Sequence, residues 1–413
     1  MNSARCPDSA RQRKHDVRNE RFSHRIAMIR SRSIPKPPPD PKRAATICEP
    51  VLGSRFPANF NVDFALWAVD TFTKLNDRVI DPFAGSGTTA LGATIRGRFS
   101  ELLEINPPWV LYSKARLCSM DSARELRKKC LRVCDTQDAR GVLESALGPD
   151  APVEIVLAGA SILAAVRERS RPRLGTNHSW PKLDVTRPFQ PDPKAIRRQV
   201  SRYIRHARWL HDLSRWKSRA LVFCADAADE EARTSKWKCL ISSPPYLSRL
   251  DYIRAAWPEN LYLNALGVIG ELRQLREHQI GGVVLGDPKN KEPLPPSIEA
   301  MLRTIRDHPS KGSSSYYEPL ARSYFQRLQR VFSSLMRTEV GGKTAILVVQ
   351  DSWYKDLYIP TAKLTARLIR RNGFRLKKTW TFENSGNLLA IHRSARKWRK
   401  TSRLKENVMW FER

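Results

Sequence analysis

The stretch Arg78-Val-Ile-Asp81-Pro-Phe-Ala-Gly85-Ser-Gly87-Thr-Thr89 decides the fold of this 413-residue chain. It joins a short β-branched strand through a glycine-rich turn to a helix that we expect from Thr88 to Arg96. Gly85 and Gly87 lack a Cβ atom, so the backbone turns tightly there and lets a ligand approach closely. The N-terminus of the following helix points N–H groups at a polar or anionic part of that ligand. The stretch therefore predicts a ligand-binding strand–turn–helix unit.

A second strand is predicted at Glu101-Leu-Leu-Glu104, and it ends in an acidic residue about 20 residues beyond the turn. In doubly wound nucleotide-binding folds, an acid at this place accepts hydrogen bonds from two ribose hydroxyls. The dehydrogenase fingerprint G-x-G-x-x-G is not met, because Ala90 stands three residues after Gly87. The pattern favours a nucleoside-containing cofactor other than a dinucleotide.

Strands and helices alternate along most of the remaining chain. Further strands are predicted at 220–224, 238–242, 344–350, 374–382 and 407–412. Helices are predicted at 62–75, 109–132, 152–166, 195–219, 251–266, 316–337 and 360–372. This alternation is typical of an α/β, Rossmann-like fold with a doubly wound, mainly parallel sheet.

A second chemical motif, Ser242-Ser243-Pro244-Pro245-Tyr246, follows the strand predicted at 238–242. Two consecutive prolines fix the backbone and remove N–H donors. The carbonyl and hydroxyl acceptors of such a loop suit an amino group whose lone pair is delocalised into a base, because they stabilise the positive charge that develops when the nitrogen reacts.

These two motifs and Glu104 resemble the DNA amino-methyltransferase family, which methylates N4 of cytosine or N6 of adenine. Asp81–Thr89 resembles motif I, Glu104-Ile-Asn-Pro107 motif II and Ser243–Tyr246 motif IV, with motif I before motif IV. The resemblance implies the class I S-adenosylmethionine-dependent methyltransferase fold, with S-adenosyl-L-methionine as cofactor and no metal. The cofactor-binding residues it implies are Phe56, Pro57, Asp81, Pro82, Phe83, Gly85, Gly87, Thr88, Glu104, Asn106 and Asp226. Asp229 competes with Asp226 for the place beside the adenine.

The resemblance also implies roles for the residues of motif IV. The Ser243 hydroxyl and the Pro244 carbonyl accept hydrogen bonds from the target amino group, and Pro245 fixes the loop. Tyr246 stacks on a base that has left the duplex. Serine at the first position of the motif favours cytosine N4, and adenine N6 is the alternative. RNA as the substrate, or a catalytically dead nucleic-acid-binding protein, are further alternatives.

The charge of the chain points to a polyanionic partner. Lys and Arg total 73 against 41 Asp and Glu, which gives a formal net charge of +32. Double-stranded DNA is the expected partner, because bound cationic side chains release its condensed counterions. The expected phosphate contacts are Arg197, Arg198, Arg202 and Arg205 on one basic helix, and Arg249 after motif IV. A solvated basic helix that only covers the sheet is the competing interpretation.

Composition suggests how the chain is divided. Residues 1–45 are expected to form a disordered basic arm, and residues 46–134 and 219–413 the catalytic domain. Residues 135–218 separate motif II from the later motifs, and we expect a basic helical insertion that recognises the target. Residues 280–314, rich in Gly, Pro and Lys, are expected to form a loop or lid.

The seven cysteines and the hydropathy bound the remaining expectations. The cysteines are scattered and odd in number, so we expect reduced thiols and no zinc site. No apolar run reaches the ~20 residues of a membrane span. A cytoplasmic, nucleoid-associated enzyme is expected, either solitary or paired with a restriction endonuclease. The sequence leaves its target sequence and oligomeric state open.

Overall fold

The computed structural model of the chain describes residues 35–43, 45–46, 49, 60–120, 122–169, 190–228, 236–248, 250–285, 292–337, 344–384, 398–399 and 403–413. Residues 38–413 form one compact unit, and every helix and strand named here lies in it. Most of the predicted arm, residues 1–34, lies outside the described residues.

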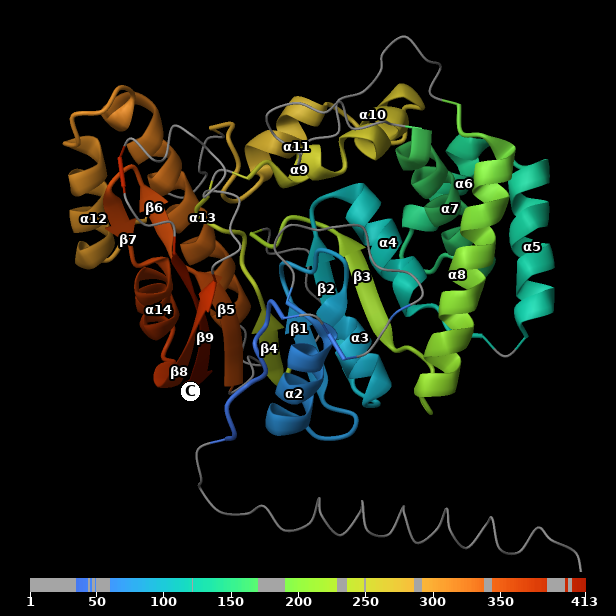
Figure 1. Cartoon of the computed structure of the whole chain (residues 1–413), viewed down its shortest axis with the longest axis horizontal. Helices are drawn as coiled ribbons and strands as arrows, with labels where there is room; N and C mark the ends of the chain where they lie inside the picture. The colour runs from blue at the N-terminus through green and yellow to red at the C-terminus, as the bar shows by residue number, and fades with distance from the viewer. Residues whose placement is uncertain are drawn as a thin grey trace, which may run out of the picture. The chain divides into compact units, whose positions relative to one another are not determined.

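Seven strands form one sheet in the order β3-β2-β1-β4-β5-β9-β8, and two short strands form a separate hairpin (Figure 1). The strands are β1 (Arg78–Asp81), β2 (Phe99–Glu104), β3 (Ala220–Cys224), β4 (Cys239–Ser242), β5 (Thr344–Gln350), β6 (Ser352–Tyr354), β7 (Leu357–Ile359), β8 (Arg375–Asn384) and β9 (Leu404–Glu412). Strands β1 to β5 are parallel, and β9 is antiparallel to both β5 and β8. The predicted α/β, doubly wound, mainly parallel, Rossmann-like fold is therefore confirmed.

Helices surround the sheet and extend beyond its β3 edge (Figure 1). They are α2 (Val62–Phe72), α3 (Thr88–Ile95), α4 (Pro107–Leu117), α5 (Ala123–Thr136), α6 (Ala139–Leu147), α7 (Val153–Arg169), α8 (Pro193–Leu213), α9 (Tyr252–Ala255), α10 (Trp257–Ala265), α11 (Leu272–His278), α12 (Pro296–Arg306), the π-helix η2 (Ser313–Tyr317), α13 (Glu318–Arg337) and α14 (Thr361–Arg371). Among the described residues, none of these helices has the length and apolar character that a membrane crossing requires.

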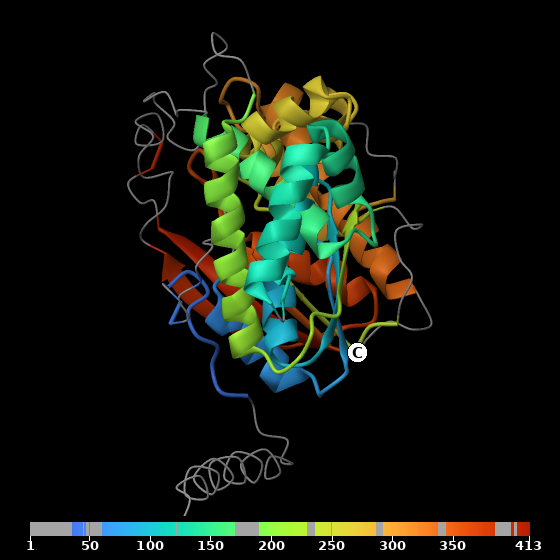
Figure 2. The same cartoon turned by 90° about the vertical axis from the view of Figure 1, so that its right-hand side faces the viewer.

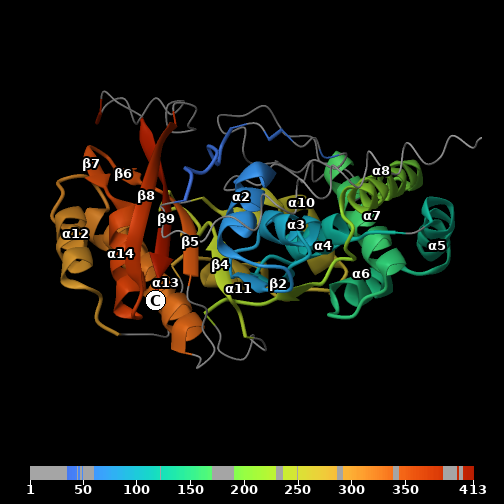
Figure 3. The same cartoon turned by 90° about the horizontal axis from the view of Figure 1, so that it is seen from below.

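Alternation along the strands gives the sheet two buried faces. Val79 and Ile346 pack against α2, whereas their chain neighbours Ile80 and Leu347 pack in the cluster that holds α12, α13 and α14. Figure 3 shows α2 and α3 on one side of the strands and α13 on the other. Because both faces are covered, the strands β1, β2, β4 and β5 are buried almost throughout, whereas the edge strand β3 is largely exposed.

Helices α4 to α8 and α10 share a second core, which contains Trp109, Leu143 and Leu157. Helices α5 and α8 run side by side at the front of Figure 2. Helices α5 to α8 form what we call the helical layer, and the predicted boundary between residues 134 and 135 falls in the last turn of α5.

Capping residues explain where several predicted elements divide. The helix predicted at 109–132 is two helices, because Ser122 starts a new one by accepting a hydrogen bond from the backbone N–H of Glu125. The helix predicted at 251–266 breaks at Ala256, two residues before Pro258. Part of the predicted loop 280–314 is helical, because α12 and the first two residues of η2 lie in it.

The ion pair between Arg167 and Glu259 joins the helical layer to the segment after motif IV. Glu259 is fully buried and accepts hydrogen bonds from the Tyr112 hydroxyl (2.9 Å) and from the Arg167 guanidinium. The Arg167 side chain keeps 31% of its surface exposed. Removing the carboxylate therefore leaves a half-buried cation without its counter-charge.

We expect Glu259→Ala to lower the free energy of unfolding by about 3 kcal/mol, because one partner of a buried pair is left uncompensated. Urea unfolding followed by circular dichroism measures the change. Arg140→Ala breaks an exposed pair with Glu144 on α6 and serves as control, with an expected change below about 0.5 kcal/mol. Equal effects of the two substitutions would contradict the role given to Glu259.

Candidate active site

The turn after β1 is held by the carboxylate of Asp81. Its Oδ1 accepts hydrogen bonds from the Phe83 backbone N–H (3.0 Å) and the Ser242 hydroxyl (2.5 Å), and its Oδ2 accepts one from the Thr89 hydroxyl (2.5 Å). Burial raises the pKa of Asp81 to about 6, although these three hydrogen bonds act in the opposite direction. Asp81 lies beneath the turn and ties together the ends of β1, α3 and β4.

The two glycines of the turn adopt backbone conformations that other residues avoid. Gly85 has φ +51° and Gly87 φ +78°, both in the left-handed region. A Cβ atom on Gly87 would lie 3.1 Å from the Cβ and Oγ atoms of Ser113 on α4. The Ser113 hydroxyl donates a hydrogen bond to the Gly85 carbonyl (2.8 Å), so the helix and the turn fix each other.

Glu104 ends β2 and faces this turn. Its Oε2 accepts a hydrogen bond from the Gly85 backbone N–H (2.8 Å), and its Oε1 accepts one from the Asn106 backbone N–H (2.9 Å). Burial raises the pKa of Glu104 to about 7, and the two backbone hydrogen bonds oppose that rise. The side chain of Asn106 points elsewhere: it donates to the Tyr252 carbonyl (3.2 Å) and accepts from Asn260 (3.0 Å).

A pocket with about 540 Å³ of empty volume opens at the carboxyl ends of β1 to β4. The strand order reverses between β1 and β4, where ligands of doubly wound folds bind. The lining residues are Pro82, Phe83, Leu103, Glu104, Ile105, Ala225, Asp226, Ala227, Ser243, Pro245, Tyr252, His278, Gln279 and Ile280.

The pocket brings together part of the predicted cofactor set. Pro82, Phe83, Glu104 and Asp226 line it, together with Ser243 and Pro245 from motif IV. The other described members of the set support the turn: the Thr88 hydroxyl accepts a hydrogen bond from the guanidinium of Arg116 (2.9 Å). Phe56, Pro57 and the competing Asp229 lie outside the described residues.

Residues 278–280 also line the pocket, and the sequence offered no sign of them. Gln279 donates to the Leu250 carbonyl (2.7 Å) and accepts from the Ile253 backbone N–H (3.0 Å). This link brings the segment after α11 against the loop that follows motif IV. A single glutamine in a polar stretch has no recognisable pattern, so only the fold reveals its position.

The motif IV loop is anchored at several points. The Ser243 hydroxyl donates a hydrogen bond to the Val348 carbonyl on β5 (3.1 Å). The Tyr324 hydroxyl donates to the Pro245 carbonyl (2.9 Å), and the Tyr246 backbone N–H donates to the Tyr252 hydroxyl (3.0 Å). The hydroxyl of Ser243 thus gives its proton to β5, and its lone pairs remain available to the pocket.

The ring of Tyr246 is buried in this structure. Its hydroxyl donates to Glu406 Oε1 (2.5 Å), and the Lys42 ammonium lies 3.5 Å from the same oxygen. The ammonium is also 5.3 Å from the centroid of the Tyr246 ring. Burial lowers the pKa of Lys42, while the Glu406 carboxylate raises it. The Lys42 ammonium thus covers the Tyr246 ring in this structure.

The predicted DNA-contacting arginines lie on the outer face of α8. Arg197 pairs with Asp135 (3.0 Å) and Arg198 with Glu168 (3.0 Å), both at exposed positions. Arg205 is exposed and Arg202 half-buried, opposite the face that packs in the helical core. Arg249 lies outside the described residues.

Comparisons with known proteins agree with a methyltransferase. Residues 11–114, a quarter of the chain, match the family model for N6/N4 DNA methylases, described as "DNA methylase". The match contains motif I and Glu104 and ends before motif IV. It supports the DNA amino-methyltransferase family and methyltransferase activity. No curated protein matches the chain significantly.

Among solved structures, the chain is similar to the "putative RNA methyltransferase PH1948 from Pyrococcus horikoshii". The identity is 10%, the similarity covers 85% of this chain and 82% of that one, and the TM-score is 0.30. At this TM-score the likeness carries no argument about the site.

We expect Gly87→Ala to lower the free energy of unfolding by about 2 kcal/mol, because alanine is strained at this φ and its Cβ crowds Ser113. Gly270→Ala is the control, since a Cβ there meets nothing within 4 Å. Thermal unfolding of both variants measures the difference. A Gly87→Ala variant as stable as Gly270→Ala would show that the turn tolerates a side chain.

Proposed function

We propose that the chain is an S-adenosyl-L-methionine-dependent DNA methyltransferase that modifies the exocyclic amino group of a flipped-out base, with cytosine N4 preferred. The observation that carries this proposal is that Glu104 and Ser243 line one pocket at the point where the strand order reverses. The Glu104 carboxylate suits the hydroxyls of a ribose, and the Ser243 hydroxyl suits an amino group. The family match to residues 11–114 supports the same activity.

The residues of the pocket fit the proposed cofactor. Each oxygen of the Glu104 carboxylate accepts one backbone hydrogen bond, from Gly85 or from Asn106. Each oxygen therefore keeps a lone pair that can accept from a ribose hydroxyl. Phe83, Ile105 and Ala227 offer apolar surface for the adenine, and Asp226 at the end of β3 is the acceptor for its amino group. When bound, the cofactor supplies an electrophilic methyl group on its sulfonium.

Motif IV prepares the amino group that receives the methyl. Because the Ser243 hydroxyl donates its proton to the Val348 carbonyl, its oxygen can only accept from the substrate amine. The Pro244 carbonyl is the proposed second acceptor. Two acceptors draw the nitrogen towards a pyramidal form and stabilise the charge that develops on it. The Tyr324 and Tyr252 hydroxyls hold the loop in place, so positioning is the main contribution of the chain.

The choice of base and polymer rests on fewer features. Ser243 favours cytosine N4, and adenine N6 is the second candidate. The net charge of +32 favours a nucleic acid. We assign docking of double-stranded DNA to the outer face of α8 and target recognition to the helical layer. The enzyme acts alone or with a cognate restriction endonuclease. RNA methylation and a catalytically dead binding protein are the further readings that the test below separates.

Cofactor affinity is expected to rise between pH 6 and pH 8. The raised pKa of Glu104, about 7, means that its carboxyl group is largely protonated at pH 6 and ionised at pH 8. Only the ionised form accepts from both ribose hydroxyls while holding Gly85 and Asn106. Calorimetric titration with S-adenosylmethionine should show roughly tenfold tighter binding at pH 8.

The variant Glu104→Gln should bind the cofactor weakly and lose this pH dependence, because it has no titrating carboxyl group. A pH dependence that survives in Glu104→Gln would assign it to another group. The raised pKa of Glu104 also affects the stability of the cofactor-free protein. The folded state binds the Glu104 proton more tightly than the unfolded state does. The free energy of unfolding therefore falls as the pH rises from about 4.5 to 7.

Methyl transfer is tested directly with labelled cofactor and a mixture of DNA and RNA, followed by mass spectrometry of the nucleosides. We expect N4-methylcytosine from DNA. Ser243→Ala should lower kcat about 100-fold, as expected for loss of one transition-state acceptor. Thr304→Ala, which removes an exposed hydroxyl on α12, is the control and should keep full activity. N6-methyladenine or a methylated ribonucleoside would correct the substrate, and cofactor binding without any methylated nucleoside would favour the dead-protein reading.

A further inference from the structure

A second pocket lies on the far side of the motif IV loop from the proposed cofactor pocket. Leu247 and Ser248, which directly follow the motif, line it together with Tyr317 of η2 and Trp353 and Tyr354 of β6. These five residues define what we call the hairpin pocket, which has about 490 Å³ of empty volume. The Ser352 hydroxyl donates a hydrogen bond to the Leu247 carbonyl, so the β6–β7 hairpin is joined directly to the catalytic loop.

Aromatic rings and cations surround the hairpin pocket. The rings of Tyr317 and Tyr354 lie 4.7 Å apart. The Lys355 ammonium is 4.9 Å from the Trp398 ring and 5.9 Å from the Tyr317 ring. The Arg399 guanidinium lies 5.3 Å from the Trp353 ring. Aromatic faces combined with cations are the means by which proteins bind unpaired nucleotides, since bases stack and phosphates attract the charge.

Lys355 occupies a strained position at the tip of the hairpin. Its φ is +56°, a left-handed conformation that lysine rarely adopts. Glycine or asparagine would form the same tight turn with less strain. A lysine held here at a conformational cost indicates a use for its ammonium group, and that group lies between two aromatic rings.

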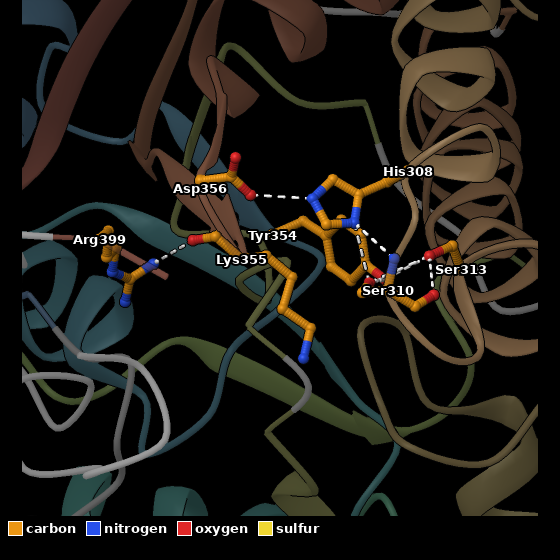
Figure 4. Close-up of polar contacts among 7 residues, drawn as sticks. All are labelled: His308, Ser310, Ser313, Tyr354, Lys355, Asp356 and Arg399. Carbon is orange, nitrogen blue, oxygen red and sulfur yellow. Dashed lines mark hydrogen bonds and ion pairs between the residues drawn. The ribbon is translucent and has the colours of Figure 1, made fainter. Parts of the chain in front are cut away.

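A polar network behind the pocket fixes the hairpin (Figure 4). His308 Nε2 lies 2.8 Å from Asp356 Oδ1 in the hairpin turn. The Tyr354 hydroxyl lies 2.6 Å from the Ser310 hydroxyl and 2.9 Å from the Ser313 hydroxyl. Tyr354 therefore cannot rotate away without losing these partners, and its ring is a fixed wall of the pocket.

This network is not the triad of a hydrolase, although it contains serine, histidine and aspartate. His308 Nδ1 accepts from the Ser310 backbone N–H (3.1 Å) and lies 2.9 Å from the Ser310 hydroxyl, so Nε2 carries the proton towards Asp356. The Ser310 hydroxyl is shared with the hydroxyls of Tyr354 (2.6 Å) and Ser313 (3.0 Å), so it holds the hairpin in place. The network is a structural support.

We propose that the hairpin pocket binds a nucleobase of the substrate strand next to the target base, with Lys355 and Arg399 contacting the flanking phosphates. This proposal rests on the proposed function, because it assigns a subsite to the same nucleic-acid substrate. Along the chain, only Tyr246 separates Pro245, which lines the proposed cofactor pocket, from Leu247, which lines the hairpin pocket. A strand with its target base at Ser243 can place a neighbouring base against Tyr317 and Trp353.

The test measures binding of a fluorescein-labelled 20-nucleotide single-stranded DNA by anisotropy, together with kcat and KM for methyl transfer to it. Trp353→Ala should weaken binding roughly tenfold and raise KM with little change in kcat, as for loss of one stacking face. Trp353→Phe, which keeps a ring, should retain most of the affinity. Cofactor binding by calorimetry should be unchanged in both variants.

Two further variants make the test decisive. Lys355→Gly relieves the strained φ, so the hairpin should stay folded, and loss of one phosphate contact should reduce the salt dependence of binding by about one ion. This variant decides the matter if Trp353→Ala fails to fold. Leu376→Ala is the control, because Leu376 is 41% exposed on β8 and lies outside both the hairpin pocket and residues 135–218.

The outcomes separate the two proposals. Weaker binding by Trp353→Ala and Lys355→Gly, with Leu376→Ala unchanged, supports the hairpin pocket. Wild-type affinity in both hairpin variants, or an equal loss in Leu376→Ala, overturns it while methyl transfer stands. Binding that depends on the hairpin without any methyl transfer keeps the pocket and refutes the proposed function. A wild-type protein that binds neither the single-stranded oligonucleotide nor its duplex overturns both.

Discussion

The buried carboxylate of Asp81 is the interaction on which the arrangement of the site depends. Through Thr89 it holds the start of α3, and through Ser242 it holds the end of β4. The turn after β1 and the motif IV loop begin at these two points. Since the strands β1 and β4 are neighbours where the sheet order reverses, one side chain sets the relative position of both loops.

This arrangement lowers the stability of the folded state. Asp81 and Glu104 both lie in a low-dielectric environment, and burial raises the pKa of each. A carboxylate that supported only the fold could be replaced by an uncharged group of similar shape. Both carboxyl groups instead lie at the carboxyl edge of the sheet, where the pocket opens. Buried carboxyl groups with raised pKa values at such a place are the pattern expected of sites that trade stability for ligand binding.

The sequence predicted most of the sheet and one half of the pocket. Strand-end motifs are local, so Asp81–Thr89, Glu104 and Ser243–Tyr246 could be found from residue type and spacing. Their convergence follows from parallel strands, whose carboxyl ends meet at one edge. What could not be predicted is contributed by distant, patternless residues. Gln279 closes the pocket through two hydrogen bonds, and Lys42 covers Tyr246 from 204 positions away along the chain.

The same limit explains why the sequence placed the nucleic-acid surface on α8. A helix with five arginines is visible in composition, whereas the hairpin carries one lysine between aromatic residues that are spread over 317–398. Of the arginines on α8, Arg197 and Arg198 already have acidic partners. An ion-paired arginine gains less from a phosphate than an unpaired one, so the number of arginines on a helix does not equal the number of phosphate contacts.

Successive residues of the motif IV loop face different surroundings. Along six residues, the chain faces three environments in turn: Ser243 the cofactor pocket, Tyr246 the Lys42–Glu406 pair, and Leu247 with Ser248 the hairpin pocket. The two outer environments are pockets, and the middle one is filled by the chain itself, because Lys42 and Glu406 lie against Tyr246. The two pockets are therefore separated along the loop by one buried side chain, that of Tyr246.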